Sequence, residues 1–177
     1  RLYDPTAYWV GKQLALFPYQ LFFPGIWIFC IYWVAGFQTE WYKFGVFFGM
    51  LESVAFVNNS AGLLFGALLP PTISTVIGPV VVLVSAMVAG FLRKLNNMSA
   101  PFFGISFASF ARWSYECLVI NEFTGLEFTC TPDEQATNGS CPYDTGEEYI
   151  DSLGFADLDL FLYMVFLLGT AAILRII

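Results

Sequence analysis

The 177-residue chain contains no histidine, and charged residues make up only 12% of it. Soluble domains carry about 25% charged residues, so the scarcity of charge argues against a soluble globular protein. Within the apolar segments, neither a carboxylate pair nor a nucleophile beside a base can be assembled at helical spacing. An integral membrane enzyme is therefore disfavoured, and we expect no catalytic residue and no metal site.

Other common features are also missing from the sequence. The chain starts at Arg1 and has no charged n-region and no signal cleavage pattern, so we interpret it as a segment of a longer protein. It contains no internal repeat and no low-complexity segment. What it does contain is apolar: hydrophobic residues make up 58% and aromatic residues 19% of the chain, and the mean hydropathy is +0.67. This composition predicts an all-α integral membrane protein.

Four apolar segments predict membrane-spanning helices, over about 14–36, 44–67, 72–92 and 158–177. Each has close to or more than the ~20 residues that a helix needs to cross the hydrocarbon core. Pro18 and Pro24 predict kinks in the first helix, and Pro70-Pro71 predicts the end of the second. Four crossings would return the chain to the side on which it began.

The region 93–157, between the third and fourth predicted spans, is expected to lie on the extracellular or lumenal side. Residues 95–128 are apolar on one side but contain prolines, glycines and charges, which predicts a re-entrant or interfacial helix instead of a crossing. Arg112 and Glu116 lie four residues apart on this helix, a spacing that predicts a structural ion pair.

An acidic loop, CTPDEQATNGSCPYDTGEEY at 130–149, indicates the orientation of the chain. Lysine and arginine are distributed over both sides and do not decide it. Asn138 begins an Asn-Gly-Ser glycosylation sequence, and Cys130 and Cys141 bracket it at a spacing that a disulfide can close. Both features point to the extracellular or lumenal side, although Asn-x-Ser sequences also occur by chance.

Five stretches carry a family likeness: YWVGK at 8–12, YWVAGF at 32–37, AGFL at 89–92, FARWSYECLVINEFTG at 110–125 and TGEEYIDSLG at 145–154. Their order resembles the second half of the transmembrane domain of G-subfamily (White/Brown type) ABC transporters, and most closely the multidrug half-transporters of that subfamily. The last two stretches are the specific ones, because apolar helices alone would match many membrane proteins.

The resemblance implies that the chain holds helices three to six of a six-helix domain, with the first two helices and the nucleotide-binding domain outside it. The absence of a G-x-x-x-x-G-K-[ST] phosphate loop agrees with this. The nucleotide-binding domain would bind ATP and Mg. The other implied partners are membrane lipids, a second subunit, identical or different, and an amphipathic small molecule or lipid that is moved outward; no nucleic acid is implied. The location implied is the plasma membrane.

The similar multidrug transporters have a third cysteine in this loop, which joins their two subunits. The loop of this chain has two cysteines, which puts a covalent dimer through it in doubt.

The resemblance also implies site residues. In the family the central cavity is lined by the fifth helix, here 72–92. Matching from the AGFL end places four residues at the cavity, with helix packing as the alternative: Pro79, Val82, Leu83 and Ala86. Phe91 and Leu92 fall where similar transporters keep a pair of leucines as a plug, so we expect them to form an apolar gate.

Glu52 is a carboxylate inside the second predicted span. Exposing its charge to lipid would be costly, so it should be protonated, paired or facing a polar interior, as functional intramembrane acids are. The alternative is that it reaches headgroups from the interface end of the span. Cys30 and Cys117 are interpreted as apolar packing residues.

A four-span scaffold of the tetraspanin type is the alternative function, because that family also places a large cysteine-containing loop before its last helix. The tetraspanin loop begins with a Cys-Cys-Gly motif, which this chain lacks. The sequence therefore favours the membrane part of an ATP-driven exporter.

Overall fold

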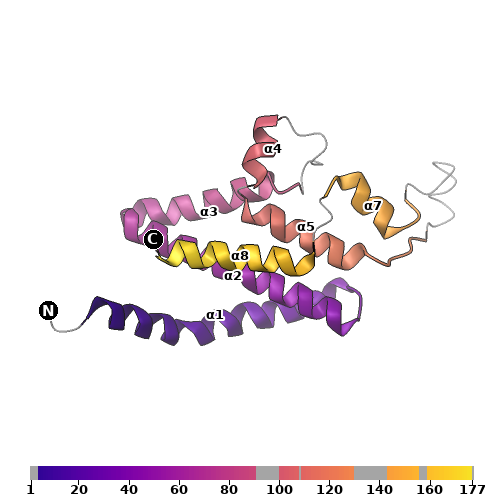
Figure 1. Ribbon diagram of the computed structural model, residues 1–177. Coiled ribbons are helices and arrows are strands. Elements are labelled where there is room, and N and C mark those ends of the chain that lie inside the picture. The colour runs from indigo at the N-terminus through magenta and orange to yellow at the C-terminus, as the bar shows by residue number, and fades with distance from the viewer. Residues whose placement is uncertain (1–3, 91–99, 108, 130–142, 156–158, 177) are drawn as a thin grey trace.

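The computed structural model describes residues 4–90, 100–107, 109–129, 143–155 and 159–176, which form a bundle of helices (Figure 1). The helices are α1 (Pro5–Ala35), α2 (Trp41–Leu68), α3 (Pro71–Met87), α4 (Ala100–Phe107), α5 (Phe110–Phe123), α7 (Gly146–Leu153) and α8 (Leu160–Ile176). Over these ranges the only strand-like feature is an isolated antiparallel bridge between Glu127 and Thr145. The predicted all-α class is confirmed.

The first helix is longer than the predicted span. α1 begins at Pro5 instead of near residue 14, because Asp4 accepts a hydrogen bond from Thr6 N at 3.1 Å and proline suits the first helical position. It continues through both internal prolines and ends at Ala35, where Gly36 takes a φ of 70°. The charge-free run predicted the part of the helix that can lie in the hydrocarbon core of the membrane, whereas the capping residues decide where the helix begins. Figure 1 shows the N-terminal part of α1 extending beyond the other helices.

The predicted break between the second and third spans is confirmed. α2 ends at Leu68, and Pro71 occupies the first position of α3. The Pro-Pro pair decides this boundary locally, because a prolyl ring disfavours a helical conformation in the residue before it.

α2 is the central helix, and it packs against α1, α3, α5 and α8. The main core combines α2, α5 and α8 through Val46, Met50, Val57, Cys117, Tyr163, Leu167 and Ala171. A second cluster, of Ile28, Tyr32 and Phe47, joins α1 to α2. Burial of Cys117 confirms its predicted packing role, but the prediction is wrong for Cys30, whose side chain is exposed on α1.

Among the described helices, α1 and α2 are long and apolar enough to cross a membrane. α3 and α8 are apolar helices of 17 residues, or ~25 Å, which is shorter than the ~30 Å hydrocarbon core. α3 ends at Met87 and not at 92, because a turn follows in which Gly90 has a φ of 97°. The four crossings stay a prediction.

The region predicted as one re-entrant or interfacial helix contains two helices, α4 and α5, with Ser109 as the N-cap of α5. α5 is not a surface helix: Arg112, Glu116 and Cys117 are buried on it, and it contacts α2, α3 and α8. Its 14 residues span ~21 Å, too short to cross a bilayer alone. A re-entrant course therefore stays a prediction.

Several predicted site residues lie outside the described ranges. They are the gate residues Phe91 and Leu92, the loop cysteines Cys130 and Cys141, and the glycosylation residue Asn138.

Candidate transport site

The predicted cavity residues share one exposed face of α3. Their spacing of i, i+3, i+4 and i+7 brings them to one side of the helix: Pro79, Val82, Leu83 and Ala86. All are exposed, with exposed fractions of 44% for Val82 and 65% for Leu83. Ser85 is half-buried, and its carbonyl accepts a hydrogen bond from Ser109 Oγ at 3.0 Å, which ties α3 to the start of α5. α3 thus presents an apolar wall that the described part of the chain leaves open.

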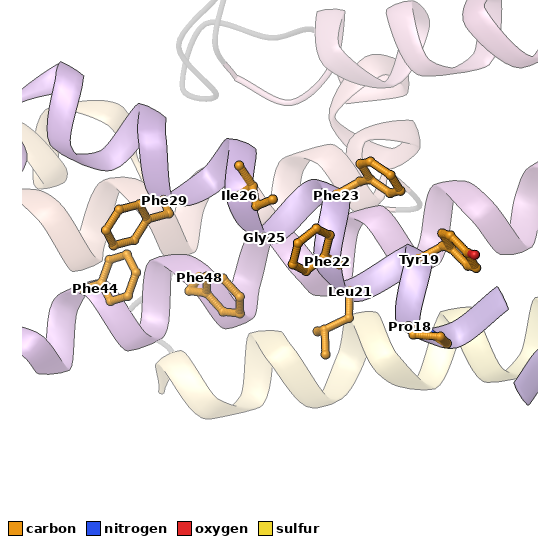
Figure 2. A pocket seen from close by; sticks show the side chains of 10 residues that line it. All are labelled: Pro18, Tyr19, Leu21, Phe22, Phe23, Gly25, Ile26, Phe29, Phe44 and Phe48. Atoms are coloured by element: carbon orange, nitrogen blue, oxygen red, sulfur yellow. The ribbon is translucent and has the colours of Figure 1, made fainter. Parts of the chain in front are cut away.

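A hollow of about 940 Å³ lies elsewhere, along α1 and the first half of α2 (Figure 2). We call it the α1–α2 groove, and it is lined by Pro18, Tyr19, Leu21, Phe22, Phe23, Gly25, Ile26, Phe29, Phe44 and Phe48. Figure 2 shows Phe29 next to Phe44, and their rings meet edge to face with centroids 6.1 Å apart. The sequence-based predictions did not include this groove. Its local signal was Pro24-Gly25, a proline and a glycine inside a span.

Glu52 lies directly behind this groove. Its side chain is only 5% exposed, and among the described residues neither carboxylate oxygen has a hydrogen-bond partner. Oε1 approaches Gly25 so closely that a Cβ built there would be 3.3 Å away. Glu52 therefore faces α1 inside the protein, which disfavours the alternative in which it reaches headgroups.

A chain of hydrogen bonds joins the middle of α1 and α2 to the end of α8. Arg175 Nε donates to Ser60 Oγ at 2.9 Å, and Arg175 Nη2 donates to Gln20 Oε1 at 3.0 Å. Gln20 Nε2 in turn donates to Asn59 Oδ1 at 3.0 Å. The polar residues were visible in the sequence, but their pairing depends on how three helices pack.

At the other end of the bundle, the link between α1 and α2 is tied to the end of α5. Gln38 N donates to Glu122 Oε1 at 2.9 Å, while Lys43 Nζ donates to Gln38 Oε1 at 2.8 Å and to Thr124 O at 2.7 Å. Asn121 Nδ2 donates to Lys43 O at 3.0 Å. Burial raises the pKa of Glu122, and the hydrogen bond from Gln38 opposes that rise. The Asn121-Glu122-Phe123 motif thus holds two distant segments together.

The Gly146-Glu147-Glu148-Tyr149 motif packs against the same end of α5. A Cβ on Gly146 would lie 1.9 Å from Phe123 O, so only glycine fits at this position. The Tyr149 ring packs against the Phe123 ring at a tilt of 46°, with ring centroids 4.9 Å apart. The Glu147 carboxylate accepts a hydrogen bond from Gly125 N at 2.8 Å, which lowers the pKa of Glu147. The two most specific stretches of the sequence therefore meet in space.

The predicted pair of Arg112 and Glu116 is confirmed. Arg112 Nε lies 3.7 Å from Glu116 Oε2, and the two side chains are 3% and 0% exposed. Arg112 Nη1 also donates to Ser106 Oγ at 2.6 Å, and the guanidinium lies 4.1 Å from the centre of the Phe107 ring. These contacts hold α5 to the end of α4, a structural role.

Comparison with known families shows what kind of domain this helical bundle is. Residues 1–123 match the family described as ABC-2 type transporter, over a range that runs from α1 to the end of α5. The chain belongs to this family. As an ABC-2 membrane domain it is part of an integral membrane transporter.

Relatives place this ABC-2 domain in the G subfamily, which confirms the resemblance seen in the sequence. It is similar to ABC transporter G family member 1 of Dictyostelium discoideum, with 26% identity over 172 residues, which are 94% of this chain and 21% of that protein. It is similar to ATP-binding cassette sub-family G member 5 of Homo sapiens, with 29% identity over 154 residues, 85% of this chain and 24% of that protein. Protein white of Ceratitis capitata is 28% identical over 164 residues, 90% of this chain and 23% of that protein. The chain thus spans between a fifth and a quarter of these relatives.

Proposed function

We propose that this ABC-2 domain is the membrane-spanning part of an ATP-driven exporter that moves amphipathic small molecules or lipids out of the cytoplasm or the inner leaflet. The observation that carries the proposal is the exposed apolar wall of α3 in a domain of this family. Such a wall binds by contact area and needs few hydrogen bonds, which suits apolar and amphipathic molecules. Membership in a transporter family disfavours the four-span scaffold.

In this proposal the substrate contacts Pro79, Val82, Leu83 and Ala86. Phe91 and Leu92 follow the turn after α3 in the sequence and form the apolar gate to the outside. ATP and Mg are bound by a nucleotide-binding domain outside this chain. A second subunit, identical or different, faces the wall and completes the cavity.

We further propose that the acidic loop lies outside the cell at the plasma membrane, with a Cys130–Cys141 disulfide and a glycan on Asn138. The bridge between Glu127 and Thr145 supports this, because it holds the two ends of the loop side by side. Closing a loop of this size with a disulfide would stabilise the protein by ~3 kcal/mol in the chain-entropy account.

The test is the ATPase activity of the full-length protein in lipid nanodiscs, with planar apolar compounds and sterols added. We expect some of them to stimulate hydrolysis, and Leu83→Trp to abolish the stimulation by filling the wall. Val34→Trp is the matched control, because Val34 is 88% exposed on α1, away from α3. Equal stimulation of the Leu83 variant would overturn the cavity assignment, and no ATPase in any lipid would overturn the exporter. Transport unchanged by the pair Phe91→Ala and Leu92→Ala would remove the gate.

A further inference from the structure

A second, smaller hollow between α1 and α2 is not explained by the α3 wall. We call it the amide hollow; its volume is about 360 Å³, and it is lined, among others, by Tyr19, Gln20, Phe23 and Pro24 of α1 and by Ala55 and Asn59 of α2. Tyr19 and Phe23 are 62% and 63% exposed, so the hollow can be reached from outside the described chain. Apart from the Tyr19 hydroxyl, the polar side-chain groups of its lining are the carboxamides of Gln20 and Asn59.

The orientation of both carboxamides follows from Arg175. A guanidinium group only donates hydrogen bonds, so Gln20 must present its oxygen to Arg175, and this oxygen lies 3.0 Å from Nη2. The nitrogen of Gln20 then faces Asn59, which must present its own oxygen, again at 3.0 Å. The amide nitrogen of Asn59 is left at the free end of the chain, and no described residue accepts a hydrogen bond from it.

This free donor lies well inside the apolar length of α2. Asn59 is nine residues before the end of the helix at Leu68, or ~14 Å along its axis, and α2 is long and apolar enough to cross a membrane. At that depth water is scarce, so a polar group needs a partner in the protein or in a ligand. The neighbouring Asn58 donates to Val54 O in its own helix at 3.0 Å. Asn59 has no such bond for its nitrogen, and it lines the hollow.

The same chain of hydrogen bonds carries an uncompensated positive charge. Arg175 is half-buried in the last turn of α8, and within the described chain it forms no ion pair. Its acceptors are the neutral side chains of Ser60 and Gln20, and the carbonyls at the end of α8 carry only a partial negative charge. Each amide turns its oxygen toward Arg175 and its nitrogen away, so the positive potential extends to Asn59. A negative group in the hollow would complement it.

We propose that the amide hollow binds lipophilic carboxylates such as fatty acids: the carboxylate accepts a hydrogen bond from Asn59 Nδ2, and the apolar chain lies against Phe23 and Pro24. Hydrogen bonds to an ionised acceptor are about twice as strong as those between neutral groups, so an acid is favoured over an alcohol of the same shape. The volume of about 360 Å³ is within the range of small-molecule sites. Arg175 acts through Gln20 and does not contact the ligand. Binding requires neither ATP nor the α3 wall, so this proposal does not rest on the exporter proposal.

The test uses full-length protein in nanodiscs of zwitterionic lipid, at alkaline pH, where the carboxyl group of a fatty acid is ionised. The probes are palmitic acid that carries a diazirine on its chain and the corresponding alcohol. The peptides labelled on illumination are identified by mass spectrometry. We expect the acid to label the part of α2 around 55–59, with saturation and with displacement by unlabelled palmitate, and the alcohol to bind there more weakly.

Two substitutions test the donor and the charge separately. Asn59→Leu removes the amide at similar size, and Arg175→Gln removes the charge of a residue that does not line the hollow. Each should weaken binding of the acid about tenfold or more, and weaken binding of the alcohol less. Asn58→Leu is the matched control, because Asn58 bonds to its own helix and does not line the hollow, and it should bind as the wild type does. Thermal melting checks that each variant is folded, and each of the two substitutions tests the proposal without the other.

Two results would overturn the proposal. The absence of displaceable labelling around 55–59, or labelling of α2 around 44–48 instead, would mean that the acid does not occupy the amide hollow, because Phe44 and Phe48 line the α1–α2 groove. Equal binding of the acid and the alcohol, unchanged in both Asn59→Leu and Arg175→Gln, would mean that the apolar walls bind without the polar chain. Neither result touches the ATPase test of the α3 wall, so the two proposals fail separately.

Discussion

Gly146→Ala tests whether the two specific motifs meet as closely as the structure has them. The added Cβ would lie 1.9 Å from Phe123 O and 2.8 Å from the carbonyl carbon, which are backbone atoms that cannot rotate away. Reaching an ordinary contact of about 3.5 Å requires α7 to move by roughly 1.6 Å. That movement breaks the hydrogen bond from Gly146 N to Leu126 O, now 2.8 Å. Overpacking costs about 1–3 kcal/mol and the lost hydrogen bond adds about 1 kcal/mol, so the contact of α7 with α5 should weaken by about 2–4 kcal/mol.

The assay is hydrogen exchange on the full-length protein in nanodiscs, read on the peptides that cover 125–128 and α7. A loss of this size corresponds to exchange roughly 30- to 900-fold faster if these amides exchange by local opening. Gly169→Ala is the control on α8, because its Cβ meets no atom within 4 Å, and it should leave exchange in these peptides unchanged. Unchanged exchange in Gly146→Ala would refute the close approach.

Two other predictions concern charged groups. Glu116→Ala leaves the buried Arg112 without its carboxylate and should cost about 3–5 kcal/mol, seen as a lower melting temperature in the same lipid; an unchanged melting temperature would contradict the structural role of the pair. The pKa of Glu147 is depressed from 4.5 by the Gly125 amide, so its contribution to stability is complete above pH 4.5 and is lost as the pH falls through the lower folded value. The melting temperature of Glu147→Gln should therefore lie below that of the wild type at pH 7. The difference between the two melting temperatures should become smaller in acid. A difference that stays constant would show that the hydrogen bond from Gly125 does not depend on the ionisation of Glu147.

Local chemistry explains which boundaries could be predicted. Pro70-Pro71 placed the break between α2 and α3, because proline restricts its own neighbours whatever the rest of the chain does. The start of α1 is also decided by local residues, the capping pair Asp4-Pro5. The prediction followed the charge-free run instead and placed the start near residue 14. The end of α3 at Met87 was missed because the apolar run continues past the turn at Gly90.

The grouping of the predicted cavity residues could be read from the sequence because they follow one helix, but their role stays a prediction. The four α3 residues share an exposed face, as their spacing requires, because helical periodicity alone decides which residues lie together. The α1–α2 groove is lined by residues of two helices, and no pattern within either segment predicts how the two pack. The motif ending in Phe123 and the motif starting at Gly146 identified the family, but their mutual contact was visible only after folding.

The sequence by itself determined that this is a helical membrane protein of the G-subfamily ABC transporters. Composition and short motifs decide this because they can be read from the chain without knowing how its helices pack. The tertiary structure alone decided which polar groups find partners. It gave Arg112 its carboxylate and Arg175 its hydrogen bonds to Ser60 and Gln20, and it left Glu52 facing a glycine. In an apolar surrounding each polar group must find its partner inside the protein or in a ligand. Those partners come from segments far apart in the chain, and only packing brings them together.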